Sequence, residues 1–207
     1  MKRAILSFAA ALAMTGAAQA DIVISEWMYD GINDEFIEFT NIGNTPVDMT
    51  GWSFDDDSNL PGTVSLSAFG IVDPGESVIL AEATDTDFIA AWGLSGVTVI
   101  GGNTTNLGRN DQINIYDAGN ALVDRLSYGD QVFVGTIRTQ NISGNPLTPA
   151  ALGANDVFQW GFSSVGDAYG SYASTGGDIA NPGIYIPEPA SAALMALGVL
   201  AMIRRRR

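Results

Sequence analysis

Carboxylates are the residues of this sequence that could do chemistry. The densest group is Asp55, Asp56 and Asp57, which the polar residues Ser58 and Asn59 follow. Calcium takes about six to eight oxygen ligands, and acids in a loop can supply several of them. Adjacent acids also repel one another when no counter-ion is near. We therefore predict a calcium site at Asp55, Asp56 and Asp57, with a solvated turn that binds no metal as the alternative.

Other catalytic residue types are scarce. The sequence has no His and no Cys, and Lys2 is its one Lys. These absences exclude Ser-His-Asp catalysis, thiol nucleophiles, the usual zinc sites and lysine-based covalent catalysis. We predict no catalytic residues and no enzyme. A glycosidase stays open as an alternative, because it needs just two carboxylates about 5 to 10 Å apart.

The first 20 residues have the three zones of a secretory signal peptide. Lys2 and Arg3 are followed by an apolar run at residues 4–14, and Ala18 and Ala20 are the small residues that signal peptidase reads. We predict cleavage after Ala20, which leaves a body that begins at Asp21.

The C-terminus has a different pattern. Pro187, Glu188 and Pro189 precede an uncharged apolar run at residues 190–203, and four Arg residues at 204–207 end the sequence. The run is shorter than the roughly 20 residues of a typical membrane-spanning helix. Terminal cations stay on the cytoplasmic side and would orient the body outward. A plain tail anchor is one interpretation of this segment.

These parts, in this order, resemble the PEP-CTERM sorting signal over residues 187–207. The resemblance implies a Gram-negative bacterium, a short transmembrane helix at residues 190–203 and recognition by exosortase, a membrane cysteine transpeptidase. It also implies removal of the helix near Pro187, Glu188 and Pro189. The protein would be anchored transiently in the inner membrane and would then reach the cell surface or the medium. Proteins of this kind accompany exopolysaccharide and biofilm genes.

Without its two ends, the sequence is strongly acidic. Residues 21–186 carry 22 Asp and Glu against three Arg, a net charge of about −19. Such a surface repels nucleic acid phosphates, which excludes binding driven by counter-ion release. It suits a solvated extracellular setting and attracts divalent cations.

The body has the pattern of an all-β protein. Short runs rich in β-branched and aromatic residues alternate with clusters of Gly, Asn, Asp and Pro, which predicts a β-sandwich or barrel. We expect one helix of about two turns at residues 85–92, with Asp85 as its N-cap and with Phe88 and Trp92 on one face. The runs expected as strands are residues 22–25, 36–39, 78–80, 113–116 and 122–126.

A second resemblance covers most of the body. Residues 34–39 (Asp-Glu-Phe-Ile-Glu-Phe), Asn41, Gly43, and then Gly51-Trp52 resemble the opening of the lamin tail domain. Later parts also fit: a Pro-Gly turn at residues 74–75, strands at residues 107–129 and a terminal Pro-Gly at residues 182–183. The resemblance implies an immunoglobulin-like β-sandwich, and domains of this family act as binding or scaffolding modules.

The last part of the body is the least regular in sequence. Phe158, Trp160 and Phe162 alternate as they would on one face of a strand. Residues 170–186 are rich in Gly, and we predict that they form a flexible stalk. The predicted organisation is a signal peptide (1–20), a lamin-tail-like domain (21–169), this stalk and the sorting signal (187–207).

Together these observations predict an exported, non-enzymatic surface or matrix protein. A calcium-dependent adhesion or glycan-binding module is the first alternative and a carboxylate glycosidase the second. The expected partners are signal peptidase and exosortase during processing, and exopolysaccharide or another surface protein afterwards. No nucleic acid partner is expected, and membrane association would be transient.

Overall fold

The computed structural model of the chain describes residues 21–129 and 137–185. The predicted signal peptide, with Ala18 and Ala20, and the predicted sorting motif at Pro187, Glu188 and Pro189 lie outside these residues, as does the predicted transmembrane helix at 190–203. Within the described residues, no helix is long and apolar enough to cross a membrane.

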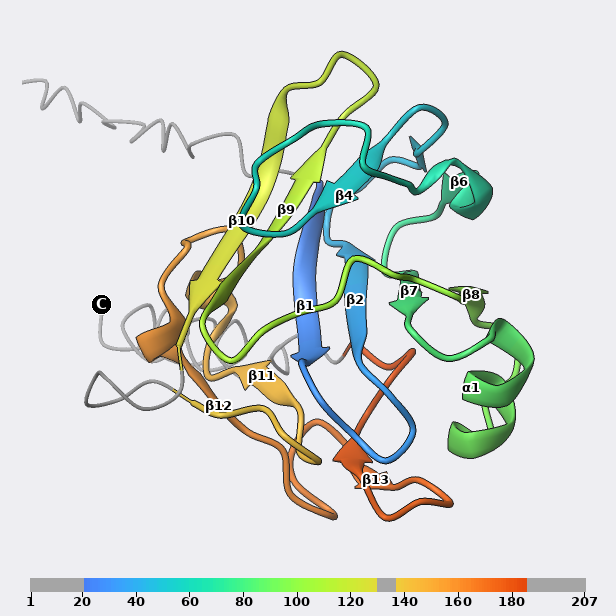
Figure 1. Cartoon of the computed structure of the whole chain (residues 1–207), viewed down its shortest axis with the longest axis vertical. Coiled ribbons are helices and arrows are strands. Elements are labelled where there is room, and N and C mark those ends of the chain that lie inside the picture. Colours follow the sequence, from blue (N-terminus) through green and yellow to red (C-terminus); the bar gives the residue numbers. More distant parts are fainter. Residues whose placement is uncertain (1–20, 130–136, 186–207) are drawn as a thin grey trace, which may run out of the picture.

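Two packed β-sheets dominate the fold (Figure 1). All neighbouring strands are antiparallel except β7 and β8, which are parallel. This architecture is consistent with the predicted all-β, immunoglobulin-like class. The larger sheet has the order β12 (Trp160–Phe162), β11 (Gly144–Pro146), β1 (Ile22–Met28), β2 (Phe36–Asn41), β7 (Ser77–Ala81) and β8 (Thr98–Ile100), and the smaller sheet has the order β10 (Leu122–Tyr128), β9 (Asp111–Tyr116), β4 (Ser53–Asp55) and β5 (Val64–Ser65).

Short elements complete the described part of the fold. They are one α-helix, two pairs of two-residue strands and three 3-10 helices. Their bounds are α1 (Asp85–Trp92), β3 (Val47–Asp48) with β6 (Ile71–Val72), β13 (Tyr172–Ala173) with β14 (Ile179–Ala180), η1 (Ser67–Phe69), η2 (Pro149–Ala151) and η3 (Val157–Gln159).

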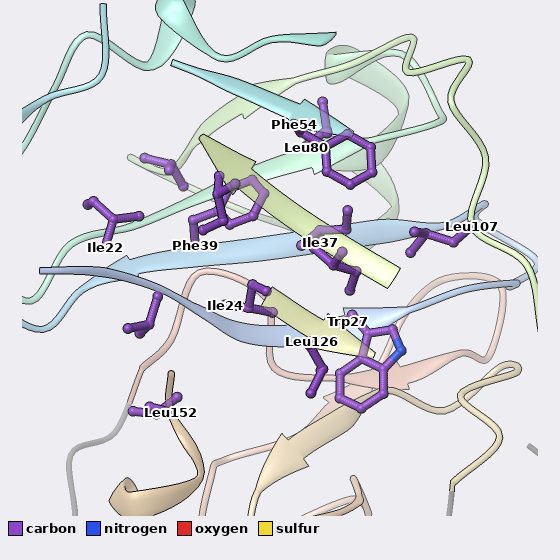
Figure 2. Close-up of a cluster of buried hydrophobic side chains, with 14 of the residues drawn as sticks. Ile22, Ile24, Trp27, Ile37, Phe39, Phe54, Leu80, Leu107, Leu126 and Leu152 are labelled. Carbon is purple, nitrogen blue, oxygen red and sulfur yellow. The ribbon is translucent and has the colours of Figure 1, made fainter. Parts of the chain in front are cut away.

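The main core lies between the two sheets. Figure 2 shows Ile37 and Phe39 of the larger sheet gathered with Phe54 of the smaller one. A β-bulge between Ile24 and Glu26 shifts the alternation of β1 by one residue, so that Ile24 and Trp27 both belong to this core. Each such fully buried side chain stabilises the fold by roughly 1.5 to 3 kcal/mol.

The outer face of the larger sheet is partly covered by α1. Phe88 and Trp92 lie on one face of this helix, as predicted, and their rings are 5.4 and 6.1 Å from that of Phe36. The N-cap is Thr84, and the prediction of Asp85 was wrong. Thr84 has the extended backbone that a cap requires, and its hydroxyl accepts a hydrogen bond from the Asp87 N–H at 3.1 Å.

Residues 170–185 pack against the same outer face, which differs from the flexible stalk that we expected. The Tyr172 hydroxyl donates to the carbonyl of Trp92 at 2.9 Å, and Ala180 is fully buried beside α1. The Gly-rich composition serves tight turns here, because Gly177 and Gly183 have φ angles of 98° and 81°. The folded body therefore continues to residue 185. We call residues 170–185 the C-terminal strap.

The aromatic residues before the strap only partly match the sequence pattern. Trp160 is buried in β12, where a late strand was expected. Phe158 belongs to the 3-10 helix η3 and is 55% exposed, and Phe162 is 52% exposed. The expectation that Phe158, Trp160 and Phe162 alternate on one face of a strand holds for Trp160 and Phe162 but not for Phe158, because the strand begins only at Trp160.

Candidate functional site

A pair of buried glutamates is the most unusual chemical feature of the fold. Glu26 of β1 and Glu38 of β2 are directly opposite each other in the antiparallel ladder, and each is 1% exposed. Both lie on the outer face of the larger sheet, the face away from the main core, because the inward neighbours Trp27 and Ile37 fill that core. The C-terminal strap covers this pair.

Glu26 receives hydrogen bonds from three residues that lie far away in the sequence. One carboxylate oxygen accepts from the Ser143 hydroxyl, from the Asn145 amide at 3.3 Å and from the backbone N–H of Asn181 at 3.0 Å. The second oxygen, Oε2, is buried and has no hydrogen-bond partner among the described residues.

Glu38 is surrounded by hydroxyl groups. Its Oε1 accepts from the hydroxyls of Ser25 at 2.7 Å, Ser77 at 3.1 Å and Thr40 at 3.3 Å. Its Oε2 accepts from the backbone N–H of Gly183 at 2.5 Å. The strap therefore donates one backbone N–H to each carboxylate of the pair.

The electrostatics of the pair favour bound protons. Burial raises the pKa of Glu26 well above its usual range, and the charge of Glu38 raises it further. Burial likewise raises the pKa of Glu38. The hydrogen-bond donors named above are all neutral, so they offset only part of the cost of burying two negative charges. Oε2 of Glu26 accepts no hydrogen bond from the described residues, so no donor stabilises the negative charge there.

A small pocket adjoins the pair. Ser25, Glu38, Asn145 and Asn181 contribute polar groups to its lining, and its volume is about 30 Å³. A water molecule needs about 10 to 15 Å³ of such space, so one or two water molecules would fit and a sugar ring would not. The rest of its lining is mostly apolar: Pro146, Leu147, Thr148, Pro149, Leu152, Tyr169, Ile184 and Tyr185.

Other buried acids hold backbone segments in place. Glu35 accepts from the N–H of Leu107 at 2.6 Å, and burial raises its pKa to about 8. Asp124 accepts from the N–H of Ile24 at 2.9 Å, which ties β10 to β1, and burial raises its pKa to about 6. Each of these two carboxylates therefore connects two segments of the backbone.

A second, more open hollow lies at the end of β1. Its lining mixes carboxylates with guanidinium groups, and its volume is about 380 Å³. The Arg138 guanidinium donates to the Tyr29 hydroxyl at 2.9 Å within this hollow. The lining residues are Tyr29, Asp30, Gly31, Asp34, Glu35, Glu82, Asn106, Leu107, Gly108, Arg109 and Arg138.

The three acids predicted to bind calcium differ in burial. Asp55 is fully buried at the end of β4, where one oxygen accepts from the Ser58 hydroxyl at 2.8 Å and from the Leu60 N–H at 2.6 Å. Asp56 is half-buried and Asp57 is exposed. Across residues 21–129 and 137–185, no three acidic side chains form a group that could hold a metal ion. The calcium site stays a prediction.

Two comparisons with protein families identify the chain. A family model described as Lamin Tail Domain matches residues 15–130, which is more than half of the 207 residues. The chain belongs to the lamin tail domain family. A second model, described as PEP-CTERM protein-sorting motif, matches residues 186–207. A search of curated proteins found no match.

The lamin tail domain supplies the glutamate pair from its first two strands. Glu38 falls within the segment at residues 34–39 that carries the family resemblance, and Glu26 is its cross-strand partner. Sequence reasoning missed the pair, because an alternating strand with a polar outer face is normally solvated. Its cover comes from residues 181 and 183, which lie beyond the family match.

The match to the PEP-CTERM motif begins at residue 186, directly after the described residues end at 185. Such a motif indicates export and exosortase-dependent sorting in a Gram-negative bacterium, with the tail anchored in the membrane. Exosortase is therefore a processing partner of this protein.

Proposed function

We propose that this protein is a non-enzymatic component of the cell surface or extracellular matrix. Its lamin tail domain serves as a binding or scaffolding module after export, and exopolysaccharide or another surface protein is the partner class. The observation that carries the proposal is the sorting motif at residues 186–207, in a chain whose residues 15–130 match a family that fits a scaffolding role.

The arrangement of the carboxylates supports this proposal over a glycosidase. Glu26 and Glu38 lie opposite each other on neighbouring strands, but each is only 1% exposed. The volume of the adjoining pocket is about 30 Å³, which is too small for a sugar ring. A glycosidase needs both carboxylates to flank a sugar bond. Glu35, Asp124 and Asp178 are engaged with backbone N–H groups.

The intact masses of the protein in the cell envelope and in the medium test the sorting. We expect a chain that begins at Asp21 and ends near Pro187, Glu188 and Pro189. A chain that begins at Asp21 and keeps Arg207 would show that the tail is a permanent anchor, and the proposed release from the membrane would be wrong.

Incubation with a panel of exopolysaccharides tests the non-enzymatic role. We expect pull-down of the processed protein with at least one polymer and no release of reducing ends. Cleavage that is lost in Glu26→Gln or Glu38→Gln would overturn the proposal in favour of a glycosidase. Cleavage that both variants keep would place catalysis elsewhere and would also overturn it.

A further inference from the structure

We propose that the C-terminal strap is a proton-controlled latch, which is closed on the Glu26–Glu38 pair at low pH and opens as the pH rises. Opening would expose the part of the outer face around the pair and lengthen the connection between the folded body and the sorting motif. This inference goes beyond the proposed scaffolding role.

The latch contacts are few and specific. Asn181 donates its backbone N–H to Glu26, and Gly183 donates its own to Glu38. The Asn181 side chain also accepts from the Asn145 amide at 2.8 Å and from the Ser171 hydroxyl at 3.2 Å. All of these bonds converge on Asn181 and Gly183. Tyr185 adds packing against the main core, which opening would also have to give up.

The surface under the latch tolerates exposure. Glu38, Thr40 and Ser77 lie there in place of the apolar residues that fill the main core, and polar groups regain hydrogen bonds to water when a cover lifts. The neighbouring surface under α1 differs, because Phe36 and Ile79 are apolar and fully buried. We therefore expect opening to be local, at residues 181–185, with α1 still packed.

Protonation determines which state is favoured. In the closed state burial raises the pKa of both glutamates, whereas in the open state both carboxylates face water and titrate near their usual values. At a pH below those usual values both states are protonated, so the closed state carries no penalty. As the pH rises between the usual and the raised pKa, the open state has released protons that the closed state still binds. Opening therefore becomes more favourable over this range.

The groups that face the pair do not oppose this titration. The donors from β1, β2, β7 and β11 are hydroxyls and an amide, as described above, and Ser163 adds a hydroxyl that contacts Ser143 and Asn145. Tyr172 of the strap has a raised pKa, first through burial and then through the charges of Glu26 and Glu38. Asp167 contacts the pair only indirectly, because it accepts from the Ser171 hydroxyl. The small pocket gives water a route to Glu38.

Opening of the latch would increase the maximum distance between the folded body and the sorting motif. With the latch closed, only Ile186 separates the described body from Pro187 of the sorting motif. If the whole strap were released, its 16 residues could extend the connection by at most about 50 Å, at about 3.3 Å per residue. Release of residues 181–185 alone would add about a third of that length.

Thiol labelling of the full-length protein in detergent micelles tests the latch. The sequence has no Cys, so single thiols can be introduced at Pro182 (Pro182→Cys), which is buried within the segment expected to open, and at Ile71 (Ile71→Cys), an exposed reference outside the strap. The ratio of the two maleimide labelling rates cancels the ordinary pH dependence of a thiol. We expect the ratio to rise by about tenfold or more from about pH 5.5 to about pH 8.5, since one pKa unit of difference corresponds to a factor of ten.

Substitution of the pair provides the control. Glu26→Gln with Glu38→Gln should remove the rise, because neither side chain titrates, and Asp57→Asn in the exposed turn after β4 should leave it unchanged. A flat ratio in the protein with both glutamates would overturn the proposal. An undiminished rise in the double variant would do the same. If the double variant does not fold, as judged by circular dichroism, Glu26→Gln alone must at least reduce the rise.

Discussion

At the scale of single residues, the acidic side chains divide into two groups. Most are solvated, but six of those in the described residues are buried: Glu26, Glu35, Glu38, Asp55, Asp124 and Asp178. Every one accepts hydrogen bonds from a backbone N–H, and several of these bonds connect segments about 100 residues apart or more. A carboxylate with several acceptor sites can join loops in a chain that has no disulfides.

Asp178 allows a prediction of how much one such buried carboxylate contributes to the free energy of unfolding. Its carboxylate accepts from the N–H groups of Ile32 at 3.0 Å and Asn33 at 2.8 Å and from the Asn141 amide at 3.0 Å. We predict that Asp178→Ala lowers the free energy of unfolding by about 1 to 3 kcal/mol, since it leaves three partly buried donors without their acceptor. Urea unfolding measures this change. The exposed control Asp57→Ala should change it by less than about 0.5 kcal/mol, and equal effects would contradict the assignment.

Glu35 allows a prediction about pH. Its pKa of about 8 in the folded state lies above the ordinary value of 4.5, so the buried carboxyl costs nothing below pH 4.5 and destabilises the fold increasingly from there up to about pH 8. We predict that the free energy of unfolding of Glu35→Gln falls less over this range than that of the unsubstituted protein, by about 2 to 4 kcal/mol. Denaturant melts at several pH values measure the slopes. Parallel slopes for the two proteins would refute the prediction, and Glu76→Gln is the control.

At the scale of the elements, local sequence predicted the strands and the helix well. The periodic runs at residues 36–39 and 78–80 became β2 and β7 with one or two added residues, since alternation and turn residues act locally. The expected strands at residues 113–116 and 122–126 became β9 and β10, which a turn at residues 117–120 joins, with Asn120 at a φ of 64°. The strap was mistaken for a stalk because its order depends on contacts with Glu26, Glu38 and α1, which lie about 80 to 155 residues away in the sequence.

The cap of α1 tests one local detail. Thr84 accepts from the Asp87 N–H, and its hydroxyl donates to the Asp87 carboxylate at 2.8 Å. We predict that Thr84→Ala lowers the free energy of unfolding by about 1 kcal/mol and that Thr84→Ser changes it by only a few tenths. Asp85→Ala should cost less than Thr84→Ala, because the exposed Asp85 caps no backbone N–H and acts through the helix dipole and one long hydrogen bond from the Thr86 hydroxyl at 3.4 Å. The reverse order in thermal melts would restore Asp85 as the cap.

At the scale of the whole molecule, the charge is the dominant property. Residues 21–186 carry about 19 net negative charges, while several acids are buried beside neutral donors. Self-repulsion of this size destabilises a compact state and weakens as salt screens it. The composition predicted the net charge. It did not predict that some acids would be buried and would therefore affect stability differently from the solvated acids. Four buried acids, Glu26, Glu35, Glu38 and Asp124, respond to pH through their raised pKa values, whereas the solvated acids respond to ionic strength.

Salt and calcium titrations separate general screening from a specific cation site. Because Asp55, Asp56 and Asp57 do not converge, we expect the thermal midpoint to rise with ionic strength and to be equal in calcium and magnesium chloride at matched ionic strength. Differential scanning calorimetry at millimolar concentrations of each salt measures this. A calcium site would instead give an additional rise in calcium alone, as ligand binding to the folded state does. If Asp55→Asn with Asp57→Asn abolished that extra rise, the adhesion hypothesis would gain its site. An extra rise that survived both substitutions would place the cation elsewhere, with the open hollow around Asp30, Asp34 and Glu82 as the next position to test.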